Sequence, residues 1–72
     1  MILEVMDQGR LEKLAVVNGS AGKDIDGRAY IGGYRLNTSG YESIWFDKSV
    51  WNIETLPKQD GILAYSLTRK AD

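Results

Sequence analysis

The chain of 72 residues contains no cysteine, no histidine and only one proline. Without cysteine it can form neither disulfide bonds nor thiolates, and without either residue it lacks the commonest ligands of zinc and haem. It also has no long apolar run, and no basic segment leads into an apolar one after Met1. We therefore predict no membrane span and no signal peptide. The expectation is a cytoplasmic protein that uses no metal or other cofactor.

The sequence also lacks a strong charge of either sign. Nine basic and ten acidic residues give a net charge of −1, and the two signs are interspersed along the chain. Proteins that bind duplex DNA or anionic membranes usually carry a basic patch, so neither partner is expected. The content of 43% hydrophobic and 26% charged residues is ordinary for a globular protein.

The length predicts one small domain over residues 1–72. A chain of this size buries only ~60% of the surface that its unfolded form exposes. So small a core leaves little stability in reserve. We therefore expect the protein to form a homo-oligomer.

The segment Ala29–Lys48 predicts a β-hairpin around Asn37-Thr38-Ser39-Gly40. Asparagine tolerates the left-handed conformation, and glycine supplies a positive φ near the end of a turn. A turn at these residues places Leu36 opposite Tyr41, which sets every other pair in the hairpin. Arg35 then lies opposite Glu42 as a cross-strand pair of opposite charges. A slip by one residue would break that pair and exchange the two faces.

The remaining chain predicts further short strands, with two segments left open. Met1–Met6 and Ile62–Arg69 are expected to be the first and last strands, and a strand is favoured over a helix for Leu11–Val17. Asn18–Gly27 is polar and glycine-rich, which suits either two tight turns or one mobile loop. Ser49–Leu56 suits a strand or a short helical turn equally well.

Turns are expected at Asp7–Arg10 and at Lys58–Gly61, so that turns recur every 8–12 residues. This spacing predicts an all-β, mainly antiparallel fold with five strands, or with four strands and a helical turn near residues 49–56. It is typical of a small SH3-like or OB-like barrel. A twisted sheet that completes its core by pairing with a second copy is the alternative.

No motif in the chain carries recognisable chemistry. Gly19–Lys23 has too few residues between its glycines for a phosphate loop and lacks the following serine or threonine. Asp24 and Asp26 match the opening of a calcium loop, but no acidic residue follows at the required spacing. No catalytic residue and no metal ligand is predicted. A binding protein is favoured over an enzyme, which would need an active site built between subunits.

The candidate site is one face of the predicted hairpin. The hairpin register puts tyrosine and tryptophan side chains on one face and Ile31, Ile44 and Phe46 on the other. Tyrosine and tryptophan combine a large apolar surface with a polar tip, and both are enriched at interface hot spots. The predicted binding residues are Tyr30, Tyr34, Tyr41 and Trp45, with Trp51 as an extension.

Two partners are compatible with such a face. A protein, either a second copy or a foreign target, is favoured because the nearby charges are balanced. Single-stranded nucleic acid is the alternative, with bases stacked on the rings and phosphates held by Arg28, Arg35 and Lys48. In a third interpretation the rings belong to the core and bind nothing.

Overall fold

The computed structural model describes residues 1–70, which form an all-β fold without a helix. Seven strands follow one another along the chain: β1 (Ile2–Asp7), β2 (Arg10–Ala15), β3 (Val17–Ile25), β4 (Arg28–Asn37), β5 (Gly40–Asp47), β6 (Trp51–Gln59) and β7 (Ile62–Arg69). Since the described residues contain no helix at all, none could cross a membrane.

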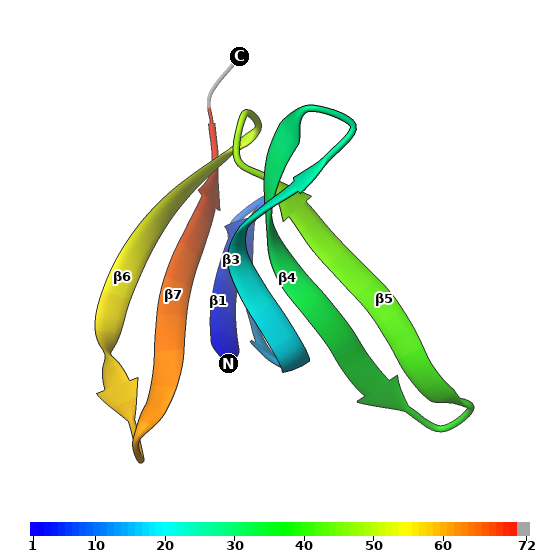
Figure 1. The fold of residues 1–72 in the computed structure, drawn as a ribbon. Helices are drawn as coiled ribbons and strands as arrows, with labels where there is room; N and C mark the ends of the chain where they lie inside the picture. Colours follow the sequence, from blue (N-terminus) through cyan, green and yellow to red (C-terminus); the bar gives the residue numbers. More distant parts are fainter. Residues whose placement is uncertain (71–72) are drawn as a thin grey trace.

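The strands build two sheets that pack against each other (Figure 1). One sheet has four strands in the order β2-β1-β7-β6, and the other has three in the order β3-β4-β5. All neighbours are antiparallel except β1 and β7, which run parallel. The predicted all-β, mainly antiparallel class is confirmed. The prediction of five strands is wrong, and no closed barrel of the SH3-like or OB-like kind is present within residues 1–70.

Three hairpins turn through pairs of residues with positive φ. The pairs are Gln8-Gly9, Asp26-Gly27 and Asp60-Gly61, with φ between 52° and 78°. Two such residues in succession are the signature of a type I′ turn, whose twist matches that of the flanking strands. The turns predicted at Asp7–Arg10 and Lys58–Gly61 are therefore confirmed.

The hairpin of β4 and β5 has the predicted register throughout. Leu36 pairs with Tyr41, and the Arg35 guanidinium donates a 2.9 Å hydrogen bond to the Glu42 carboxylate. The turn is tighter than expected, because Asn37 and Gly40 themselves pair. The Asn37 side-chain oxygen accepts a 2.9 Å hydrogen bond from the Ser39 backbone N–H, which closes the turn.

Two polar segments differ from their predicted form. Of the two turns proposed within Asn18–Gly27, the one at Asp26-Gly27 is present. The rest of the segment is neither a turn nor a loop, because β3 runs through it with irregular pairing near Asn18 and at Gly22. A helical turn near residues 49–56 is also wrong: β6 starts at Trp51 and continues past Pro57 with a register shift. Both segments form strands because a neighbouring strand supplies their hydrogen bonds.

The core lies between the two sheets. It is built by Leu3, Val5, Leu14, Val16, Ile31, Trp51 and Leu67. Ile44 and Phe46 pack against it from β5, so the predicted apolar face of the hairpin does face the interior. Val16 joins β2 to β3 at the point where the chain passes from one sheet to the other.

Gly33 lies where β3 crosses β4 most closely. A Cβ atom at this position would come within 2.8 Å of the Gly19 Cα and 2.9 Å of the Val17 carbonyl oxygen. Contacts this short are not tolerated between a side chain and backbone. Glycine at position 33 therefore lets β3 pack closely against β4.

Candidate functional site

The four aromatic side chains predicted to share a face lie on the outer side of the three-stranded sheet. Ile31 of β4 points into the core, so its neighbours in the strand point outward. Cross-strand partners share a face, and the pairs that carry the rings are Tyr30–Asp47, Gly32–Trp45, Tyr34–Ser43 and Leu36–Tyr41. We call this surface the aromatic face.

The exposed part of the aromatic face lies toward the β4–β5 turn. Tyr41 is 70% exposed and Tyr34 is 42% exposed, whereas Tyr30 and Trp45 are half-buried. Tyr34 and Tyr41 together with Asn18 of β3 line a shallow hollow of about 200 Å³. The described residues leave this end of the face open to solvent.

Trp45 is held by two neighbours on the aromatic face. The Lys23 ammonium of β3 lies 4.5 Å from the centre of its ring, which is a cation–π contact. Its indole N–H donates a 3.2 Å hydrogen bond to the Ser43 hydroxyl. These contacts fix the ring and cover part of it, so Tyr34 and Tyr41 offer the more accessible rings.

Trp51 does not belong to the aromatic face, and we withdraw it from the candidate site. It is only 9% exposed and lies in the core, where its ring meets Phe46 edge-on at 5.3 Å between centres. The Arg69 guanidinium lies 4.6 Å from the centre of the Trp51 ring. Trp51, the first residue of β6, thus packs between the two sheets and cannot extend the aromatic face.

Two residues that were not predicted add apolar area to the aromatic face. Leu36 is 66% exposed beside Tyr41, and Val17 is 43% exposed beside Tyr34. Leu36 could have been found from the hairpin register alone, because it pairs with Tyr41. Val17 could not, because nothing in the polar stretch that follows it indicates a strand paired with β4.

Two carboxylates at the borders of the hairpin are held in their charged form. Hydrogen bonds from the Ser49 backbone N–H and hydroxyl, at 2.9 and 2.8 Å, lower the pKa of Asp47, and Arg28 at 3.6 Å adds to the effect. The hydrogen bond from Arg35 lowers the pKa of Glu42, with a smaller contribution from Asn37. The charges beside the rings are therefore largely paired within the chain.

Within residues 1–70, histidine, cysteine, aspartate and glutamate form no cluster of three or more that could hold a metal ion. Comparison with protein-family models, with curated proteins and with solved structures gave no match. The aromatic face is thus the feature from which a function is argued.

Proposed function

We propose that the chain is a small cytoplasmic protein-binding module whose contact surface is the aromatic face, and that the partner is a second copy of the same chain. The face would contribute Tyr34, Tyr41 and Leu36 as the contact centre, with Tyr30 and Trp45 beside them. It acts by binding and not by chemistry.

The observation that carries this proposal is the solvent exposure of large apolar side chains in one cluster. Leu36 and Tyr41 form a cross-strand pair and are both more than half exposed, with Tyr34 and Val17 alongside. Single exposed apolar residues are common on protein surfaces, but a contiguous group of them marks an interaction site. Burial of this group against a partner would remove apolar area from water.

A second copy suits this surface for two reasons. The core of a 72-residue chain is small, so burial of further apolar surface on association would add to its stability. The aromatic face is also bordered by β5, an edge strand without a partner on its outer side among the described residues. An uncovered edge can pair with the same edge of another copy.

The charges near the rings favour a protein over single-stranded nucleic acid. A stacking groove usually combines open rings with unpaired cations that follow the phosphates. Here Lys23 covers Trp45. Lys48, one of the three residues named as phosphate ligands, forms no ion pair within residues 1–70 but lines a separate hollow beside β6. The two arginines named have carboxylate partners: Arg28 lies 3.6 Å from Asp47 and Arg35 lies 2.9 Å from Glu42. These pairs leave little positive charge for a phosphate backbone.

Sedimentation analysis over a range of protein concentrations tests the proposal. The unmodified chain should associate, and the double variant Tyr34→Ala, Tyr41→Ala should weaken association by about tenfold or more. Lys13→Ala, an exposed residue of β2 on the other sheet, is the matched control and should associate like the unmodified chain. A chain that stays monomeric at all concentrations would refute self-association.

A titration with short single-stranded oligonucleotides at low salt decides the alternative. Nucleic-acid binding through the same rings should weaken steeply as salt is added. Such binding, abolished in the double variant, would replace the protein-binding proposal. We expect no binding.

A further inference from the structure

The two sheets leave a cleft open where their edge strands β3 and β6 face each other. The cleft has a volume of about 410 Å³ and is lined by residues of β3, β4, β6 and β7, together with Lys48 and Lys70 just outside the strands. It shares no lining residue with the hollow between Tyr34 and Tyr41. Its lining is therefore independent of the aromatic face.

The charge of this cleft is unusual for a chain with a net charge of −1. Lys48 and Lys70 both line it, and no aspartate or glutamate is among the lining residues. Neither lysine forms an ion pair within residues 1–70, although the charge of Lys70 helps to lower the pKa of the Asp47 carboxyl group. Lys48 is half-buried as a residue, so part of its side chain packs within the cleft. A cation in this situation favours an anion beside it.

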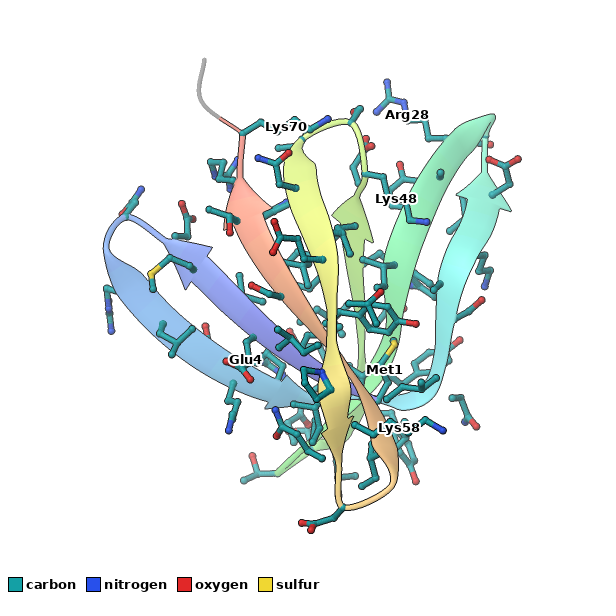
Figure 2. The ribbon with its side chains drawn as sticks, turned by 90° about the vertical axis from the view of Figure 1, so that its left-hand side faces the viewer. Met1, Glu4, Arg28, Lys48, Lys58 and Lys70 are labelled. Atoms are coloured by element: carbon teal, nitrogen blue, oxygen red, sulfur yellow. The ribbon has the colours of Figure 1, made fainter. Side chains whose placement is uncertain are left out.

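The backbone holds Lys48 at the border of the cleft, and its side chain extends toward β3. Its N–H donates a 3.0 Å hydrogen bond to the Ala29 carbonyl, which anchors the residue at the end of β5. Its ammonium nitrogen reaches β3, where it lies 3.7 Å from the point that a Cβ of Gly22 would occupy. Gly22 has a φ of +84° and lies at an irregularity in the pairing of β3 with β4. Figure 2 shows Lys48 between β6 and β4, near the same end of the molecule as Lys70.

The rest of the cleft offers both hydrogen-bonding and apolar groups. Asn52 and Thr55 of β6 supply an amide and a hydroxyl, and Ile53 and Tyr65 supply apolar surface. Binding sites for small molecules typically combine a largely apolar lining with a few polar groups that orient the ligand. A volume of about 410 Å³ lies within the usual range for such sites.

The charges that line a second cleft, between the other two edge strands β2 and β5, can be compared with those of the β3–β6 cleft. The cleft between β2 and β5 is larger, about 590 Å³, but both signs of charge line it. Arg35 of that cleft lies 3.6 Å from Glu12, and Asp7 lies 3.2 Å from Arg69. Three of its four charged lining residues are thus paired within the chain, and Arg10 has no described ion pair; in the β3–β6 cleft neither Lys48 nor Lys70 has one.

From these observations we propose that the β3–β6 cleft binds a small organic anion. Its carboxylate or phosphate group would lie between Lys48 and Lys70, and a flat apolar body would pack on Ile53 and Tyr65. Carboxylate and phosphate share the chemistry that two ammonium groups recognise, and the experiment separates them.

The test is an amide NMR titration of the full chain with three probes of similar size, namely benzoate, phenyl phosphate and benzyl alcohol. At least one of the two anions should shift the amides of Lys48, Asn52 and Thr55, and the stronger binder identifies the anionic group. Neutral benzyl alcohol should bind more weakly than that anion. Lys48→Gln should weaken binding of the anion by about tenfold, the loss expected for one charged hydrogen bond. Lys58→Gln, at the far end of the molecule in Figure 2, should bind it as the unmodified chain does.

Several results would overturn the proposal. These are no shifts from either anion, equal binding of benzyl alcohol and the anions, shifts spread evenly over all lysines, or equal losses in the two variants. If Lys48→Gln does not fold, Lys70→Gln takes its place with the same expected weakening. Anion binding can be measured whether the chain is monomeric or self-associated. The titration therefore tests the cleft independently of the proposed role of the aromatic face.

Discussion

The outer faces of the two sheets follow the same alternation but carry different chemistry. On the four-stranded sheet, Glu4 pairs with Lys13 across β1 and β2 and accepts a 2.9 Å hydrogen bond from Gln59. The next outward pair, Met6 and Leu11, is exposed but aliphatic. On the three-stranded sheet the corresponding outward positions hold Tyr34, Tyr41 and their neighbours. Alternation thus decides which residues face outward, and the identity of those residues decides what the surface can do.

The largest expected effect concerns the core that both sheets share. Trp51→Ala should lower the free energy of unfolding by about 3–5 kcal/mol, because it removes a buried ring from the contact between the sheets. Trp45→Ala, the matched variant on the aromatic face, should cost much less because its ring is only half-buried. Chemical denaturation measures both. Equal losses would mean that Trp45 is as much a core residue as Trp51.

A second variant acts on the three-stranded sheet alone. Gly33→Ala places a methyl group against the Gly19 Cα and the Val17 carbonyl, so β3 must move away from β4. We expect a loss of about 1–3 kcal/mol in the free energy of unfolding, the usual cost of overpacking. Thermal unfolding provides the measurement. An unchanged melting temperature would show that β3 is not held against β4 as described.

A third variant changes surface chemistry without changing the fold. Tyr41→Ala should alter the free energy of unfolding by no more than about 0.5 kcal/mol, as for most exposed positions. It should nevertheless weaken self-association, because it removes the most exposed ring of the aromatic face. Sedimentation and thermal unfolding of the same sample separate the two effects. A large loss of stability in the monomer would mean that the ring supports the fold.

The smallest effect concerns the pH dependence of stability. Since the pKa of Asp47 is lowered in the folded chain, its contribution is present above the unfolded pKa of about 3.9 and is lost as the pH falls through the folded value. Asp47→Asn should therefore reduce the loss of melting temperature on acidification below about pH 4. Glu54→Gln, a β6 residue without a described hydrogen bond or ion pair, is the control. Identical profiles for the unmodified chain and Asp47→Asn would contradict this role.

Local signals were sufficient to predict the β4–β5 hairpin. The turn residues, the Arg35–Glu42 pair and the segregation of aliphatic from tyrosine side chains all specify the same register. The final strand and the tight turns were likewise predictable, because glycine positions and alternation lie within a few residues of each other. The division of the hairpin into a core face and an outward face followed from the register.

Features that depend on distant contacts could not be predicted. β3 is polar and rich in glycine, and it forms a strand only because β4 supplies its hydrogen bonds. The parallel pairing of β1 with β7 joins the two ends of the chain, which no local pattern encodes. For Trp51 the sequence left strand and helix open, and only the packing of the two sheets places its ring in the core.

An NMR dilution series tests the central claim most directly. If the aromatic face joins two copies, dilution should shift the amides of β4 and β5 around Tyr34, Leu36 and Tyr41. The amides of β1 and β2 around Glu4 and Lys13 should stay constant. Concentration-dependent shifts confined to the four-stranded sheet, or no shifts at any concentration, would contradict the claim.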